Sequence, residues 1–430
     1  MIRVSKHILR YSNFNKLENY TAFLIEMRRV AKIYVEYLWN THYEWIDKKG
    51  RIRIMDISKD QLEVPSYFDY NLINVETTLS ARALSSLITQ CCGIVKACTE
   101  KQKDRYYILN EKKHNNEKIS EKLLENIEKN KPQKPETKNI NIELSSKCCD
   151  FEKINSNSFE GFLRLKSIGK VFGQIKIPIK FHKQSNKWKT KAKMMNSFLF
   201  CSNKIELRWE LEVPLKTEGK TIGSDQGKTD VLVLSDGQVT PKTNKHGKSL
   251  DSILDKMSKR KWGSKNFKQT QAERKNFINY SINQLDFSKI QKLNFEKIIN
   301  IRFQKRCSRK MVHWLNTLIR DKTEKVCEEA GVQFSEQSSA YKSQRCSCCG
   351  IVLKRNRKGK VYFCRNCGHL IDADLNASIN QEIELPDVPF WLSSLHLNLT
   401  EGFFWNLNGF FSVNGEEFRV PHSEKSVVVN

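Results

Sequence analysis

The sequence lacks the long apolar runs of a membrane protein. Nowhere do about eighteen apolar residues follow one another, which is the length that a helix needs to cross a bilayer. The N-terminal stretch MIRVSKHILRYSNF also lacks the continuous apolar core and the small-residue cleavage site of a signal peptide. We therefore expect no membrane span, no export signal and no membrane partner.

The cysteines lack the pattern of a disulfide framework. Their number, 13, is odd, and four of them form two CxxC pairs. Most of the others stand in apolar or helical contexts, such as Cys98, Cys201 and Cys327. This usage is typical of a reducing compartment and a metal site, so we expect a cytoplasmic protein.

Acidic residues are scarce relative to basic ones. The 430 residues include 74 Lys or Arg against 48 Asp or Glu, a net charge of +26. The excess is spread over the whole length, which argues against a simple basic tail, and no long basic amphipathic helix suits an anionic membrane. A polyanion partner, most plausibly nucleic acid, is expected. The length predicts two or three domains.

The N-terminal half changes pattern several times. Alternation predicts one strand within 1–15, and helical spacing follows at 16–43 and at 75–103. Residues 110–147 are rich in Lys, Glu and Asn and are interpreted as a charged linker. From 150 to 218, period-two alternation with β-branched and aromatic residues predicts a small antiparallel barrel or sheet, which the N-terminal strand could join.

From Lys220 onward the pattern predicts an α/β layer. TIGSDQGKTDVLVLSDGQVT predicts three strands joined by turns, and the basic segment 241–275 predicts helix with a face suited to backbone phosphates. A strand at 290–299, a helix at 307–330 ending before Gly331, a strand at 332–339 and a last helix from Ala373 follow. This order describes a ribonuclease-H-like fold.

Three acidic residues occupy the places where that fold carries its acids. Asp225 lies in the first strand, Glu296 near the end of a later strand, and Asp374 at the start of the last helix. An aspartate in an apolar hairpin is costly to bury unless it is paired or binds a cation, although the nearby Gly227 also allows a simple turn aspartate. Asp372 is the alternative third acid; we prefer Asp374 because it directly precedes the last helix.

These carboxylates suit phosphodiester hydrolysis by two Mg²⁺ ions. Such ions need hard oxygen ligands that hold them about 3.5–4 Å apart. One carboxylate that bridges both ions, with one more on each side, is sufficient. Asp225 is the candidate for the bridge.

The two CxxC pairs are the most specific signal. Cys346 and Cys349 are separated by 14 residues from Cys364 and Cys367, a spacing that predicts a structural zinc ribbon with one Zn²⁺ and no open coordination position. Cys348 is out of register. Between residues 341 and 370 there are eight Lys or Arg and no acid, which favours contact with nucleic-acid phosphates over a merely solvated face.

Five motifs carry a resemblance to the transposon-encoded TnpB proteins and, equally, to the compact type V CRISPR effectors of the Cas12f group. They are SDQG at 224–227, FEK at 295–297, SQRCSCCG at 343–350, FCRNCG at 363–368 and DADLNASIN at 372–380. Residues 1–215 fit this family in layout only. Gln226 stands where many relatives have a small apolar residue, so strand packing could differ there.

The resemblance implies an RNA-guided DNA endonuclease whose partners are a guide RNA and target double-stranded DNA, read next to a short flanking motif. It implies a prokaryotic, cytoplasmic enzyme and is compatible with a homodimer on one guide. Arg345 would be able to reach the scissile phosphate. The implied parts are a wedge-like β domain at 1–15 and 150–218, a helical recognition domain at 16–149, a RuvC-like nuclease domain at 219–340 and 370–384, a zinc-ribbon insert at 341–369 and a tail at 385–430.

Two other functions stay open. One is an RNA-guided DNA-binding protein that does not cleave, although all three acids are present. The other is a guide-free RuvC-like transposase or resolvase, which the zinc ribbon and the basic N-terminal half disfavour. The residues do not separate a transposon protein from a CRISPR effector. They also leave open whether the aromatic-rich tail is loose or covers an apolar surface.

Overall fold

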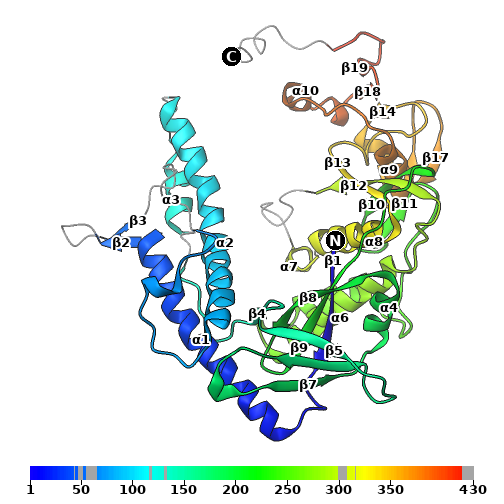
Figure 1. Ribbon diagram of the computed structural model, residues 1–430. Helices are drawn as coiled ribbons and strands as arrows, with labels where there is room; N and C mark the ends of the chain where they lie inside the picture. Colours follow the sequence, from blue (N-terminus) through cyan, green and yellow to red (C-terminus); the bar gives the residue numbers. More distant parts are fainter. Residues whose placement is uncertain are drawn as a thin grey trace. The chain divides into compact units, whose positions relative to one another are not determined.

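The chain folds as a mixed α and β protein with two compact units (Figure 1). A computed structural model describes residues 1–42, 44–46, 52–54, 65–115, 119–129, 133–298, 308–314 and 316–418. The first unit is Met1–Glu212 and the second begins at Val213. Within the described ranges, no helix combines the length and the apolar character of a membrane span.

Two long helices dominate the first unit. Helices α1 (Phe14–His42) and α2 (Ala81–His114) run side by side in Figure 1. Buried aromatic residues of α1 fix it in place: the Tyr20 hydroxyl donates to the Cys201 carbonyl at 2.6 Å, and the Phe23 ring meets Phe172 edge-on. The other helices in the described part of this unit are α3 (Glu121–Lys129), α4 (Lys183–Lys191) and the single turns η2 (Tyr70–Leu72) and η3 (Lys170–Phe172).

The strands of the first unit form antiparallel sheets. The larger sheet has the order β1-β9-β8-β4, and a second sheet has the order β5-β6-β7. No closed barrel is present in the described part of the chain, so the predicted barrel is replaced by two separate sheets and a short hairpin, β2-β3. The strands are β1 (Ile2–Ile8), β2 (Glu44–Ile46), β3 (Ile52–Ile54), β4 (Ile142–Leu144), β5 (Cys149–Lys153), β6 (Gly161–Leu165), β7 (Ile175–Ile179), β8 (Lys193–Phe200) and β9 (Lys204–Glu210).

The predicted linker 110–147 is more ordered than its composition suggested. Helix α2 continues to His114, α3 lies within the segment, and β4 pairs with β8. Ile142 and Leu144 are fully buried, because alternation over only three residues is enough to place two apolar side chains in the sheet. The Lys- and Glu-rich composition around them hid this short strand.

The second unit is built on a four-stranded sheet of order β11-β10-β12-β13. Strands β10, β12 and β13 are parallel, and β11 is antiparallel to β10. The predicted third strand of the hairpin is reduced to an isolated bridge between Val233 and Val239. The strands are β10 (Lys220–Gln226), β11 (Leu232–Leu234), β12 (Ile290–Lys297) and β13 (Gln333–Ser338).

Helices cover both faces of this sheet. Apolar side chains such as Ile222, Leu293 and Phe295 form one core with α5, α6 and α8, whereas α9 packs against the opposite face of β10. The basic segment is helical as predicted from Leu250 onward, in two helices joined by a short loop, whereas residues 241–249 are not helical. The helices are α5 (Leu250–Ser258), α6 (Lys265–Ile282), α7 (Arg309–Val312), α8 (Asn316–Ala330) and α9 (Ala373–Glu382).

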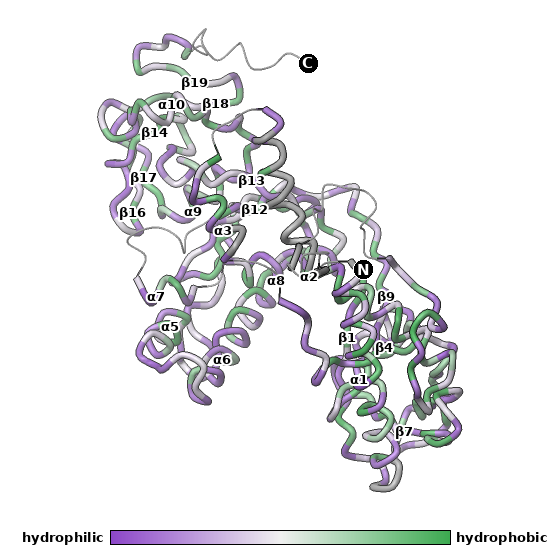
Figure 2. The backbone as a smooth tube through the Cα atoms, turned by 90° about the vertical axis from the view of Figure 1, so that its left-hand side faces the viewer, coloured by the Kyte–Doolittle hydropathy of each residue, from purple (hydrophilic) through white to green (hydrophobic). Residues whose placement is uncertain are grey.

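The cysteine segment and the C-terminal segment fold together. The insert holds η5 (Lys354–Asn356), β14, β15 and β16, and the sheet β15-β16-β17 is completed by the strand that directly follows the insert. Strand β14 pairs with β18 of the C-terminal segment. Figure 2 shows α10, β18 and β19 gathered beside β14. Within 385–418 the predicted tail therefore covers an apolar cluster that includes Val352, Phe403 and Trp405. The elements are β14 (Ile351–Val352), β15 (Arg357–Lys358), β16 (Val361–Phe363), β17 (Leu370–Asp372), α10 (Phe390–Ser394), η6 (Leu397–Leu399), β18 (Phe403–Asn406) and β19 (Gly409–Phe411).

Candidate functional site

The first pair of predicted acids comes from neighbouring parallel strands. Ser224 of β10 is paired with Phe295 of β12, so the next residues along the two strands are Asp225 and Glu296. Residues at the same level of a parallel pair project from the same face. Phe295 lies in the core shared with α5, α6 and α8, and both acids therefore project from the other face, where α9 packs.

Helix α9 brings the third acid to the same place. Gly223 is the point of closest approach: a Cβ there would lie 2.0 Å from the Ser378 carbonyl oxygen. Asp374 precedes Ser378 by four residues, or about 6 Å of helix, and Asp225 follows Gly223 by two residues, or about 6.6 Å of strand. The two acids therefore lie at nearly equal distances along their elements from the contact between Gly223 and Ser378. Their carboxyl groups converge for this reason.

Gln226 positions Glu296. Its backbone N–H donates to Glu296 Oε2 at 3.4 Å, and its side-chain amide donates to the Glu296 carbonyl oxygen at 3.0 Å. The side chain of Gln226 is buried between the strands. The residue that departs from the family pattern thus clamps the end of β12, a role that the sequence did not indicate.

Asp372 and Asp374, the two candidates for the third acid, differ in their burial and in their contacts. Asp372 is exposed and caps α9, since its Oδ1 accepts from the backbone N–H groups of Asp374 at 2.9 Å and Leu375 at 3.1 Å. Asp374 is buried. Its charge raises the pKa of Asp225, which places it within electrostatic range of that carboxyl. The geometry therefore favours Asp374, and Asp372 is accounted for as a helix cap.

The electrostatics of the cluster suit a bound cation. Burial, with the charges of Glu296 and Asp374, raises the pKa of Asp225 well above its usual range. Burial also raises the pKa of Glu296 to about 7. Carboxylates held together without a cation resist ionisation for this reason. Their oxygens are the hard ligands that divalent cations such as Mg²⁺ prefer, so the donor set fits such an ion.

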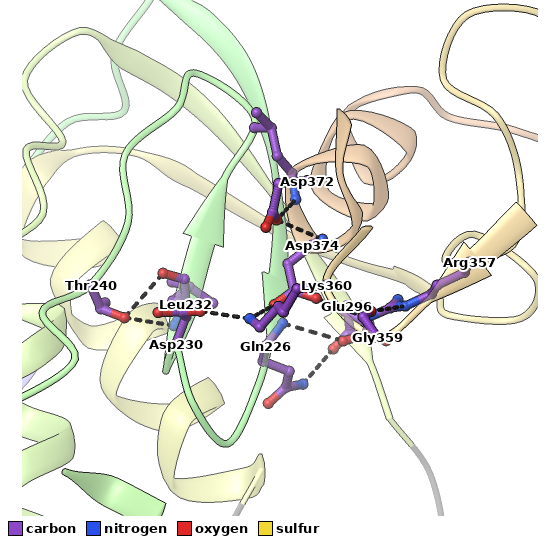
Figure 3. Close-up of polar contacts among 11 residues, drawn as sticks. Gln226, Asp230, Leu232, Thr240, Glu296, Arg357, Gly359, Lys360, Asp372 and Asp374 are labelled. Atoms are coloured by element: carbon purple, nitrogen blue, oxygen red, sulfur yellow. Dashed lines mark hydrogen bonds and ion pairs between the residues drawn. The ribbon is translucent and has the colours of Figure 1, made fainter. Parts of the chain in front are cut away.

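Two basic residues of the insert contact the third acid (Figure 3). Arg357 donates to Asp374 Oδ1 at 2.8 Å, and Lys360 pairs with Asp374 Oδ2 and with Asp230 Oδ2, the latter at 2.6 Å. Asp230 is buried, and its Oδ1 has no hydrogen-bond partner among the described residues. Asp230, Arg357 and Lys360 were not singled out from the sequence; the acid-free basic run around the cysteines was the signal for the last two.

The four predicted zinc cysteines converge on one point. Their sulfur atoms all lie within 4.8 Å of one another. The Sγ atoms of Cys346 and Cys367 are 3.7 Å apart, and those of Cys349 and Cys364 are 3.6 Å apart. Tetrahedral Zn–S bonds of about 2.3 Å require S···S separations of about 3.8 Å. The set therefore fits one structural Zn²⁺, and Cys348 is an exposed thiol outside it.

Arg345 does not lie where a phosphate could reach it. Its side chain is 6% exposed, and its Nε donates to the Trp405 carbonyl oxygen at 2.8 Å. Its Nη1 donates to the Cys346 carbonyl and to Asn380 Oδ1. The guanidinium instead ties the first zinc knuckle to α9 and β18. The expected phosphate contact is thus corrected to a structural role, because the side chain is buried and its Nε and Nη1 donate inside the protein.

Comparison with known proteins places this segment in a family. Residues 318–381 match the Cas12f1-like TNB domain family. Over 82 residues the chain is 38% identical to the CRISPR-associated endodeoxyribonuclease Cas12f1 of Sulfoacidibacillus thermotolerans, which covers 19% of each protein. Over 80 residues it is 29% identical to the TnpB-like protein aq_aa05 of Aquifex aeolicus strain VF5, covering 18% of this chain and 26% of that protein.

The predicted resemblance to TnpB and Cas12f is thus confirmed. The chain spans less than a third of the length of either curated relative in these matches. The Cas12f-like fold extends further. The Cas12f1 protein in a cryo-EM structure of a Cas12f1–sgRNA–target DNA complex superposes with a TM-score of 0.50 at 14% identity, over 86% of this chain and 83% of that one. At this identity the likeness concerns the fold alone.

Proposed function

We propose that this protein is an RNA-guided DNA endonuclease. The observation that carries the proposal is the convergence of Asp225, Glu296 and Asp374 at one face of the sheet, with Asp374 inside the residues 318–381 that match the Cas12f1-like TNB domain. A protein of this family in complex with a guide RNA and target DNA has the same fold. The excess of basic residues suits both partners.

The reaction assigned to the site is RuvC-type hydrolysis of a phosphodiester. Two Mg²⁺ ions, when bound, would activate water and stabilise the leaving oxygen. Asp225, Glu296 and Asp374 would hold them, with Asp225 shared because the other two carboxylates lie near it. Arg357 and Lys360 bring cationic groups to the same acids and suit the negative charge of a DNA phosphate.

The other parts follow the resemblance. We assign the strands of the first unit to a wedge-like domain, its long helices to guide and target recognition, and the insert at 341–369 to target binding. A cytoplasmic, prokaryotic location and a homodimer on one guide stay predictions. The zinc ribbon would be structural, because four thiolates leave no open position on the ion.

The test compares acid variants with a matched control. Asp225→Ala, Glu296→Gln and Asp374→Asn should each lower guided DNA cleavage by more than about 100-fold, since a metal ligand is worth several kcal/mol in the transition state. Asp372→Asn should retain most activity, because an asparagine oxygen can still cap α9. If all four variants still bind guide RNA, the loss of cleavage in the three acid variants is a defect of the hydrolysis step and not of assembly with the guide. Cleavage that survives Asp225→Ala would overturn the assignment.

A further inference from the structure

Trp262 is unusually exposed for its residue type. It lies in the loop between α5 and α6, and 70% of its surface is accessible to solvent. Tryptophan is large and apolar and is highly buried on average. An exposed tryptophan is therefore expected either to bind a partner molecule or to be held in place by packing against buried residues of its own chain.

The indole packs against two buried aromatic rings, those of Phe267 and His313. The Trp262 ring lies 4.9 Å from the ring of Phe267 and is stacked on His313 at 6.0 Å, measured between centroids. Phe267 and His313 are themselves buried and meet edge-on at 5.5 Å. Arg309 of α7 donates to the Arg260 carbonyl at 2.9 Å and so fixes the loop against α7. The indole is held in place while much of its surface stays in solvent.

The surface around the indole is strongly basic. Asp251 and Asp255, the acids of α5, are both paired with Lys310, at 2.7 and 2.9 Å. The cations that surround the loop are solvent-exposed: Lys259, Lys261, Lys265 and Lys268. An aromatic platform among exposed lysines is complementary to a polyanion that also has flat faces, which is the chemistry of an unpaired nucleotide.

The residue that Trp262 stacks on leads into α8, which begins at the acid-bearing edge of the sheet. The Asn316 amide at the start of α8 donates to the Ile298 carbonyl at 2.9 Å, just beyond Glu296. His313 precedes Asn316 by three residues. The hydrogen bond from Lys310 is the main cause of the lowered pKa of Asp255 in α5, and the charge of Lys228, in the turn after Asp225, adds to it. Figure 2 shows α5, α6 and α7 grouped together below β12 and α9.

We propose that Trp262 is a stacking platform for an unpaired base of the DNA strand that passes to the acids, with the exposed lysines of the loop holding its phosphates. The inference rests on the proposed nuclease function, because only a DNA strand that is cleaved at the three acids would have to pass near Trp262. It adds a binding site that is separate from guide pairing and from the zinc ribbon.

The test measures binding of a short fluorescent oligothymidylate to the full chain loaded with guide RNA, in EDTA so that no cleavage occurs. Trp262→Ala should weaken binding roughly 5- to 150-fold, the range for loss of one stacked base, without changing the salt dependence. Trp262→Phe should stay close to the wild type. Lys261→Gln with Lys265→Gln should lower the salt slope by about 1.4, because each phosphate that is no longer neutralised removes about 0.7 from it.

The matched probe is oligouridylate, and melting temperatures are measured for every variant. Weaker oligothymidylate binding by a Trp262→Ala protein with an unchanged melting temperature supports the proposal. Unchanged binding, or a loss confined to oligouridylate, overturns it. If Trp262→Ala lowers the melting temperature but does not weaken binding, the indole only stabilises the fold, and the proposal is overturned as well. Failure of the nuclease assignment would appear in the cleavage assay and not in this binding assay, which is carried out in EDTA.

Discussion

At the scale of single residues, the sequence predicted the acids and the cysteines but not their partners. Asp225, Glu296 and Asp374 could be chosen because they stand at fixed places in a strand and helix order. Gln226 and Asp230 could not, because each acts through a contact across 70 or 130 residues of chain, with Glu296 and Lys360 respectively. The prediction for Arg345 was wrong because its position beside a cysteine pair does not show which way its side chain is buried.

Burial of Glu296 predicts a pH dependence of stability. Its pKa is about 7 in the folded, metal-free protein against an ordinary 4.5, so the folded state holds a proton that the unfolded chain releases. The free energy of unfolding should therefore decrease as pH rises from about 4.5 to about 7, and Mg²⁺ affinity should increase over the same range. Melting temperatures in EDTA, and calorimetric Mg²⁺ titrations, measure both. Glu296→Gln should make each curve shallower, and the raised pKa of Asp225 should leave a residual slope; equal slopes in variant and wild type would contradict the shift.

The ion pairs of Lys360 predict a competition with metal. Its ammonium lies between Asp374 and Asp230, and Asp230 is therefore a second acceptor that can hold it when a cation takes Asp374. Lys360→Met should tighten Mg²⁺ binding, and Asp230→Asn should weaken it severalfold. In the double variant the effect of Asp230→Asn should vanish. Titration calorimetry decides, because a loss that persists in the Lys360→Met background would make Asp230 a direct metal ligand.

At the scale of elements, periodicity predicted the strands and helices of the second unit well. Strand β10, strand β12 and helix α9 have long or strongly patterned sequences. Strand β4 was missed because it is three residues long inside a Lys- and Glu-rich segment. The fold of 385–418 was undecided, since pairing of β18 with β14 depends on a partner about 50 residues away that no local pattern identifies.

The contact between β10 and α9 predicts a strict requirement for glycine. A Cβ at Gly223 would meet the Ser378 carbonyl at 2.0 Å and the Glu382 N–H nitrogen at 2.2 Å, both backbone atoms that cannot rotate away. Gly223→Ala should destabilise the second unit by about 1–3 kcal/mol and lower cleavage by displacing Asp374. Denaturant unfolding measures the first effect. Gly93→Ala in α2 is the control, because no atom lies within 4 Å of the added Cβ and its φ is not positive. Equal stability of wild type and Gly223→Ala would contradict this packing.

If the four cysteines hold a structural zinc ion, its removal should lower cleavage indirectly, through unfolding of the insert. Cys364→Ser, or removal of zinc by a chelator, should unfold the insert, because a structural zinc site contributes roughly 10 kcal/mol or more to its own folding. Arg357 and Lys360 would then leave Asp374, and cleavage should fall although all three acids remain. Zinc content by elemental analysis and melting temperature follow the change. Cys348→Ser is the matched control, since Cys348 is exposed and outside the four-sulfur set.

At the scale of the whole molecule, the mixed α and β class was predicted correctly, whereas the described residues hold open sheets in place of a barrel. Period-two alternation identifies strands but carries no information on whether a sheet closes, because closure depends on pairing between the first and last strands. The α/β layer of the second unit was recognisable because its element order and its motifs agree. The charge excess indicated a polyanion partner, and the family resemblance implied the guided reaction that we propose.

The most direct test of the central proposal is cleavage of DNA by the purified protein with a guide RNA whose targeting segment is exchanged. We expect Mg²⁺-dependent cuts that move with the guide sequence, require the guide, and disappear in EDTA and in the Asp225→Ala protein. Guide-directed binding without any cut would favour the non-cleaving alternative. Cuts at the same place with either guide, or without RNA, would contradict the proposal and favour a guide-free nuclease.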